Sequence, residues 1–99
     1  MASRTFNLFK LNDGITGLKR ALNDQGITIL HIESLIESST FHVEMNGRMT
    51  QIELRESETK DHPLARLGSV FSVIATIPDD DYWKVLDHVL TMAFLRGGG

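Results

Sequence analysis

The sequence contains no cysteine among its 99 residues. Without cysteine the chain can form no disulfide bond and has no thiolate for nucleophilic chemistry, which fits a reducing compartment. It also has no apolar run of about 18 residues, the length that a membrane-spanning helix requires. The first residues lack the apolar segment of a secretory signal. We therefore expect a cytoplasmic protein that has no membrane partner.

Excess positive charge is absent as well. Ten lysine and arginine residues stand against 13 aspartate and glutamate residues, which gives a net charge of −3. Nucleic acids and anionic membranes attract clustered positive charge, so we expect no nucleic-acid partner. An apolar content of 41% and a charged content of 23% are ordinary for a folded domain of this length. The sequence predicts one domain over residues 1–99, with residues 96–99 as a flexible tail.

The first part of the chain predicts a strand, a helix and a second strand. Residues 5–11 (TFNLFKL) alternate loosely between polar and apolar positions, as strands do. Asp13 is placed to cap a helix, and Gly26 suits its end. Residues 27–34 (ITILHIES) then begin with a β-branched run. Because a helix joins the two strands, we expect a crossover that places them side by side. The apolar face of this helix comprises Ile15, Leu18, Ala21 and Leu22.

A β-hairpin is the clearest local signal. Asn46-Gly47 lies between two alternating runs, and this dipeptide is typical of a type I′ turn, in which both central residues have positive φ. Pairing across this turn fixes the register of the two strands. The predicted pairs are Met45 with Arg48, Glu44 with Met49, Val43 with Thr50, His42 with Gln51 and Phe41 with Ile52.

The remainder of the chain predicts a loop, a strand and a helix. Residues 56–62 form a charged connection, and residues 63–68 could form one helical turn. Residues 69–77 (SVFSVIATI) have the pattern of an interior strand, and residues 79–95 that of a helix. The expected fold is therefore α+β, a ferredoxin-like βαββ(α)β sheet with helices on one face, an extra hairpin strand and a C-terminal helix. The buried face of the last helix comprises Trp83, Leu86, Val89, Leu90, Ala93 and Phe94.

One segment resembles a known family. The spacing Ile15-x-x-Leu18-x-x-x-Leu22, followed by GITILHIES at residues 26–34, is similar to the first helix and second strand of ACT domains. The similarity is closest to the regulatory domains of aromatic amino acid hydroxylases and prephenate dehydratases, and it covers residues 5–45. It implies a βαββαβ domain that forms a homodimer and senses a small molecule, typically an amino acid.

The resemblance also implies where such an effector would bind. The effector loop would comprise Asn12 to Gly14, with the ammonium group of the ligand near Asp13 and its carboxylate on the helix amides. The second strand would provide the other side of the site. The ligand-binding residues expected on this basis are Asn12, Asp13, Gly14, Ile15, His31, Glu33 and Ser34.

Two other kinds of site are suggested by the residues themselves. His31 and Glu33 lie two apart on a predicted strand, and His42 and Glu44 repeat this spacing on the hairpin. If the strands were adjacent and faced alike, these groups could hold a metal ion, but polar residues of an exposed sheet face explain them better. An enzyme with His31 and Glu33 as acid and base is the weakest interpretation. We expect no catalytic residue, no metal and no cofactor.

A partner surface is suggested by the last helix. Tyr82 and Met92 lie off its apolar stripe, and an acidic cluster precedes it (Asp79, Asp80 and Asp81). The sequence therefore favours a non-catalytic, dimeric regulatory module that senses an amino-acid-like effector or modulates a partner protein. The alternative is a small protein inhibitor of the phage or mobile-element type, such as an anti-defence protein, which acts by docking on a target protein.

Overall fold

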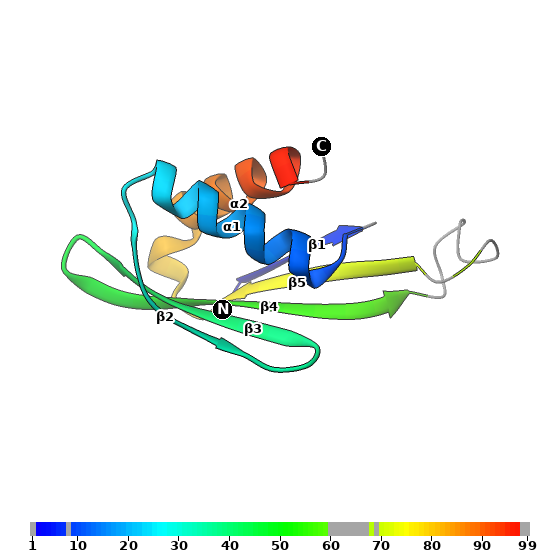
Figure 1. Cartoon of the computed structure of the whole chain (residues 1–99). Helices are drawn as coiled ribbons and strands as arrows, with labels where there is room; N and C mark the ends of the chain where they lie inside the picture. Colours follow the sequence, from blue (N-terminus) through cyan, green and yellow to red (C-terminus); the bar gives the residue numbers. More distant parts are fainter. Residues whose placement is uncertain (1, 8, 60–67, 69, 98–99) are drawn as a thin grey trace.

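The computed structural model describes residues 2–7, 9–59, 68 and 70–97. These residues form five strands and two α-helices, and both helices lie on the same face of the sheet (Figure 1). The α+β class is therefore confirmed. The elements in chain order are β1 (Ala2–Asn7), α1 (Leu11–Asp24), β2 (Thr28–Ser34), β3 (Ser38–Met45), β4 (Arg48–Thr59), β5 (Val70–Ile77), the short 3-10 helix η2 (Asp80–Tyr82) and α2 (Trp83–Gly97).

The strand order is β1-β5-β4-β3-β2, and every neighbouring pair is antiparallel. β1 and β2 consequently point in the same direction but lie at opposite edges of the sheet. The prediction that they lie side by side is wrong, because β5 inserts between β1 and β4 and the hairpin strands fill the rest. The interior position of β5 is confirmed. This order does not confirm the ferredoxin-like arrangement.

The hairpin has the predicted turn and register. Asn46 has φ 52° and Gly47 has φ 80°, as a type I′ turn requires. Met45 pairs with Arg48, and the four further predicted pairs are all present. β4 continues to Thr59 and pairs with β5 there, so the prediction of a loop is wrong for residues 56–59. The rest of that predicted loop and residues 63–67 of the predicted helical turn lie outside the described residues.

The helices bury one face of the sheet in a single core. Leu18 and Leu22 of α1, and Leu86 and Leu90 of α2, are fully buried against β3, β4 and β5. Three rings form an aromatic cluster where β1 meets α2: Phe6 stacks on Phe94 at 4.0 Å, and Phe9 meets Phe94 edge-on at 5.0 Å. The helical periodicity of the sequence thus predicts these faces, except that Ile15 and Trp83 are only half-buried at the border of the core. The full set of core residues is Leu11, Leu18, Ala21, Leu22, Phe41, Val43, Met45, Ile52, Leu54, Val73, Ala75, Ile77, Leu86, Val89, Leu90, Ala93 and Phe94.

A glycine ends α1, and an aspartate caps the start of η2. Gly26 (φ 71°) terminates α1 as predicted, with the Ile27 amide donating to the Leu22 carbonyl. Asp79 caps η2, where its side chain accepts from the Asp81 amide. α2 extends to Gly97, so residues 96 and 97 of the expected tail are helical. Residues 98 and 99 lie outside the described residues.

The second face of the sheet, termed the outer face below, points away from both helices (Figure 1). No element of the described residues covers it. Since side chains alternate along a strand and Phe41, Val43 and Ile52 face the core, their sequence neighbours occupy the outer face. The outer face therefore carries mainly polar side chains, among them His42, Glu44, Gln51, Glu53 and Arg55.

Candidate functional site

The expected effector loop is part of a helix. α1 begins at Leu11, and its N-cap residue, Lys10, makes no side-chain capping hydrogen bond. Asn12 and Asp13 are exposed within the first turn, and Gly14 is buried beneath the aromatic cluster. The prediction that Asp13 caps this helix is wrong, because the helix starts earlier than the local sequence signal suggests. Residues 12–14 therefore belong to the first turn of α1 and do not form a loop.

A distant carboxylate fixes this early helix start. The backbone amide of Leu11 donates to Glu56 Oε2 at 2.6 Å, across 45 residues of sequence. Amides of the first helical turn have no partner within the helix, and a carboxylate accepting from one of them also complements the helix dipole. Glu56 lies on the part of β4 that was expected to be a loop. The cap is therefore formed by the tertiary structure.

The expected binding residues of β2 lie on two sides of the sheet. His31 pairs with His42, and Glu33 pairs with Thr40, so both side chains point to the outer face. Ser34 pairs with Ser39 on the helix side, where the two hydroxyl oxygens are 3.1 Å apart. Since α1 covers the opposite face, the structure does not bring Asn12, Asp13, Gly14 and Ile15 together with His31 and Glu33.

His31, Glu33 and His42 do form a small polar cluster on the outer face. Glu33 Oε1 lies 3.4 Å from His42 Nε2 and 3.8 Å from His31 Nε2, and the two imidazole rings are 5.7 Å apart. Among the residues that the structure describes, His42 Nε2 has no hydrogen-bond partner. The condition for a shared metal site, adjacent strands that face alike, is thus met. Within the described ranges, however, no group of three or more histidine, aspartate or glutamate side chains is arranged to hold a metal ion.

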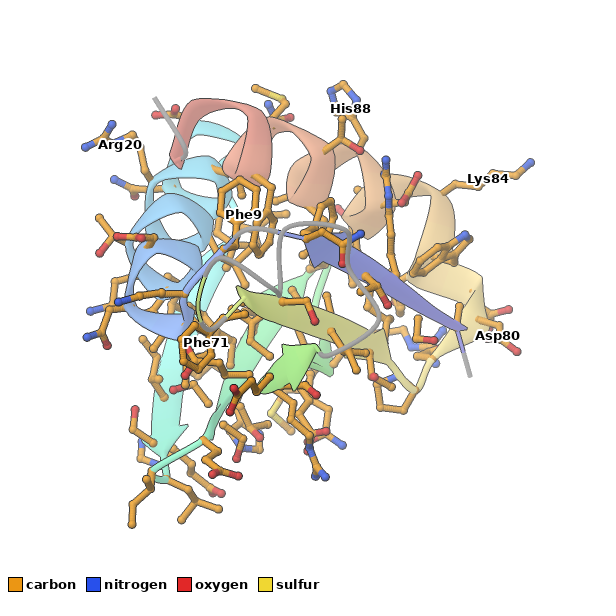
Figure 2. All side chains as sticks on the ribbon, turned by 90° about the vertical axis from the view of Figure 1, so that its right-hand side faces the viewer. Phe9, Arg20, Phe71, Asp80, Lys84 and His88 are labelled. Carbon is orange, nitrogen blue, oxygen red and sulfur yellow. The ribbon has the colours of Figure 1, made fainter. Side chains whose placement is uncertain are left out.

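The residues expected to bind a partner contact different elements. Asp79 is half-buried with Oδ2 3.9 Å from Arg48 Nη2, and the Arg48 guanidinium lies 5.4 Å from the Tyr82 ring. Asp80 and Asp81 are exposed, and Asp80 projects outward from η2 in Figure 2. Met92 lies on α2, where its sulfur accepts from Gln25 Nε2. Tyr82 thus contacts the start of β4, whereas Met92 contacts the end of α1.

A surface that the sequence analysis missed lies along β2. Residues 27–36 contain six large aliphatic side chains, and none of them is fully buried. Leu30 is 45% exposed, Leu35 76% and Ile36 98%. Neighbouring core residues of β3, by contrast, are completely buried. We call residues 27–36 the β2 edge segment; its remaining aliphatic members, Ile27, Ile29 and Ile32, are half-buried.

The β2 edge segment borders an open groove beneath α1. The groove has a volume of about 600 Å³. Its floor is aliphatic and its α1 rim is polar, with a single positive charge from Lys19. No other strand of the described part of the chain pairs with the far side of β2. The residues that line the groove are Lys19, Asn23, Gly26, Ile27, Thr28, Ile29 and Ile32.

The β2 edge segment also has one irregularity. The pairing of β2 with β3 shifts between Ile29 and His31, so Leu30 is an extra residue in a β-bulge. The bulge brings Ile29 and Ile32 onto the helix side together and leaves His31 and Glu33 together on the outer face. Strand alternation is therefore interrupted at Leu30, so Ile29 and His31 lie on opposite faces although they are two residues apart.

A second, smaller cavity opens on the outer face. It has a volume of about 340 Å³ and lies where β5 ends beside β3 and β4. His42, Gln51 and Asp79 contribute an imidazole, an amide and a carboxylate to its wall. Such a set can form hydrogen bonds and an ion pair with a small polar molecule. The other lining residues are Met49, Thr50 and Pro78.

Comparison with known protein families found no matching family, and comparison with curated proteins found no match. In the described residues, neither helix has the length and apolar character needed to cross a lipid bilayer.

Proposed function

We propose that the protein is a non-catalytic binding module that modulates a partner protein by docking through the β2 edge segment. The supporting observation is the incomplete burial of six aliphatic side chains within ten consecutive residues. Exposed apolar side chains gathered in one short segment favour a protein interaction site. Leu35 and Ile36 project furthest, at the turn between β2 and β3, and they are the residues best placed to enter an apolar pocket of a partner.

The open edge of β2 adds directional contacts to this apolar surface. An unpaired strand edge offers amide and carbonyl groups to an extended segment of another protein. Pairing of this kind supplies main-chain hydrogen bonds, and the adjoining groove accepts alternate side chains. The floor of the groove is aliphatic, so apolar side chains fit it best.

A photo-crosslinking experiment tests this proposal. A photoreactive amino acid is introduced in place of Ile36, and the matched control carries it in place of Val85, which is aliphatic, 50% exposed and located on α2. We expect one specific adduct from position 36 in cells that naturally produce the protein. The partner identified from this adduct is then purified and its affinity for the protein is measured.

Two substitutions decide the outcome with the purified partner. Ile36→Ser should weaken binding strongly, because it removes an apolar anchor that makes almost no intramolecular contact. Val85→Ser should leave the affinity unchanged. Equal adducts from both positions, or equal losses of affinity in both variants, would refute docking through the β2 edge segment.

A second candidate function is the sensing of a small amino-acid-like molecule. The outer-face cavity favours it, since Asp79 could pair with an ammonium group while His42 and Gln51 donate to a carboxylate. A panel of the twenty amino acids in a thermal shift assay tests this idea, because a ligand at a hundredfold excess over its dissociation constant stabilises the folded state by about 2.7 kcal/mol. Asp79→Asn should abolish the shift. No response from any amino acid would remove this candidate.

A further inference from the structure

We infer that the β2 edge segment also binds a second copy of this chain, through antiparallel pairing of β2 with β2 about a twofold axis at Ile32. This inference uses the surface of the proposed function but does not depend on it. It concerns what covers that surface when no partner protein is bound.

The backbone of β2 has the required open groups. The Leu35 amide donates to the Ser38 carbonyl, so Leu35 directs its backbone groups toward β3. In an antiparallel ladder this direction alternates along the strand. Glu33 therefore also faces β3, whereas Ile32 and Ser34 direct their amide and carbonyl groups away from the sheet. Ile32 can thus exchange two hydrogen bonds with the Ile32 of another copy.

The side chains around Ile32 are complementary to themselves under this symmetry. With Ile32 on the axis, His31 of one copy lies opposite Glu33 of the second copy, and the reverse pair forms on the other side. An imidazole opposite a carboxylate is a favourable cross-strand pair. On the helix side the two Ile32 side chains meet, and each extends the aliphatic floor of the other copy's groove.

Other registers are less favourable. An axis at Glu33 places two carboxylates directly opposite one another, which destabilises a strand pair. In addition, the amide and carbonyl groups of Glu33 already bond to β3 and are not free to pair with a second copy. An axis at Ser34 pairs Ile32 with Ile36, which lies in the turn and outside the strand. The bulge at Leu30 limits regular pairing on the other side of the axis, so the contact is centred on Ile32 and short.

The first test is oligomeric state and disulfide trapping with the full chain. Light scattering should give twice the mass of 11.1 kDa at high concentration. Because the chain has no cysteine, the Ile32→Cys variant has a single thiol that can bond only to a second copy. Hydrogen-bonded antiparallel neighbours lie about 5.5 Å apart at Cα, within the usual range of a disulfide. Thr5→Cys on the β1 edge is the matched control and should remain uncrosslinked.

The second test exchanges the charged pair. His31→Glu should weaken the dimer about tenfold, because the symmetric contact then holds two pairs of like charge. His31→Glu combined with Glu33→His should restore it, since the pairs are only exchanged. Gln51→Glu adds a carboxylate to the outer face away from the edge and should have no effect. Circular dichroism confirms that each variant is folded.

Three results would overturn the inference: a monomeric wild-type protein at every concentration, a dimer in which Thr5→Cys crosslinks and Ile32→Cys does not, or a charge exchange that fails to restore pairing. These results leave the partner-docking proposal intact, because that proposal is tested by crosslinking from position 36. If both are correct, the purified partner should convert the dimer into a heterologous complex.

Discussion

Replacing Glu56 by alanine should destabilise the protein although Glu56 lies outside the apolar core. Its carboxylate accepts the Leu11 amide at 2.6 Å and is the only described side chain that caps α1 at this end. Loss of a helix N-cap costs about 0.5–2 kcal/mol, and hydrogen bonds to charged groups lie near the upper end of the range for a single bond. Because Glu56 is only half-buried, we expect a loss of about 1–2 kcal/mol in the free energy of unfolding.

Urea titration followed by the fluorescence of Trp83, the single tryptophan, measures this loss directly. In a thermal scan each kcal/mol corresponds to about 4–8 °C for a domain of this size. Glu58→Ala is the matched control: it removes an exposed carboxylate two residues along the same strand, and its loss should be within about 0.5 kcal/mol of zero.

A local cap should rescue the variant. Lys10→Asp supplies a carboxylate at the N-cap position of α1, so adding it to Glu56→Ala should recover at least half of the lost stability. The reasoning is refuted if Glu56→Ala costs no more than Glu58→Ala. It is also refuted if Lys10→Asp stabilises the wild type as much as it stabilises the Glu56→Ala variant. In that case the new aspartate and Glu56 would not be capping the same end of α1.

Three further substitutions test the packing and the turn. Gly14→Ala places a Cβ 3.1 Å from the ring of Phe94, which the aromatic cluster holds in place. We expect the free energy of unfolding, measured by urea titration, to fall by about 1 kcal/mol, because overpacking outweighs the gain in helix propensity. A more stable variant would show that the ring moves freely. Gly47→Ala meets no atom within 4 Å but must keep φ 80°, so we expect backbone strain alone to lower the free energy of unfolding by about 1 kcal/mol, measured as a lower thermal midpoint. Leu54→Ala should lower the free energy of unfolding by about 2–5 kcal/mol because Leu54 is fully buried. Met49→Ala changes a side chain that is 76% exposed and should leave this free energy nearly unchanged. Similar losses in the two variants would contradict the assigned strand faces.

Local sequence signals predicted the elements whose geometry depends on neighbouring residues. Asn46-Gly47 specified both the turn and the complete register of β3 and β4, because positive φ at two successive positions admits few alternatives. Gly26 likewise marked the end of α1. The nearly continuous β-branched and aromatic run of β5 identified an interior strand without any knowledge of its neighbours.

The errors arose where distant groups decide the structure. The start of α1 depends on Glu56, and the position of β1 depends on pairing with β5, so neither could be read from the residues nearby. The extension of β4 to Thr59 has the same origin, since β5 supplies its partner. For the same reason Asp13, which was assigned to an effector loop, lies in the first turn of α1, and the exposure of the aliphatic residues of β2 was not predicted.

The pairing of β1 with β5 also bears on how the protein avoids aggregation while it folds. β2, β3, β4 and β5 follow one another as sequential neighbours and can assemble from local contacts, whereas β1 joins from far away in the sequence and such long-range pairing is slow. Until β1 docks, β5 is an edge strand, and its sequence VFSVIATI contains no charged residue. Uncharged segments of high β-propensity are templates for amyloid-like stacking. The docking of β1 thus closes an edge through which nascent chains would otherwise polymerise.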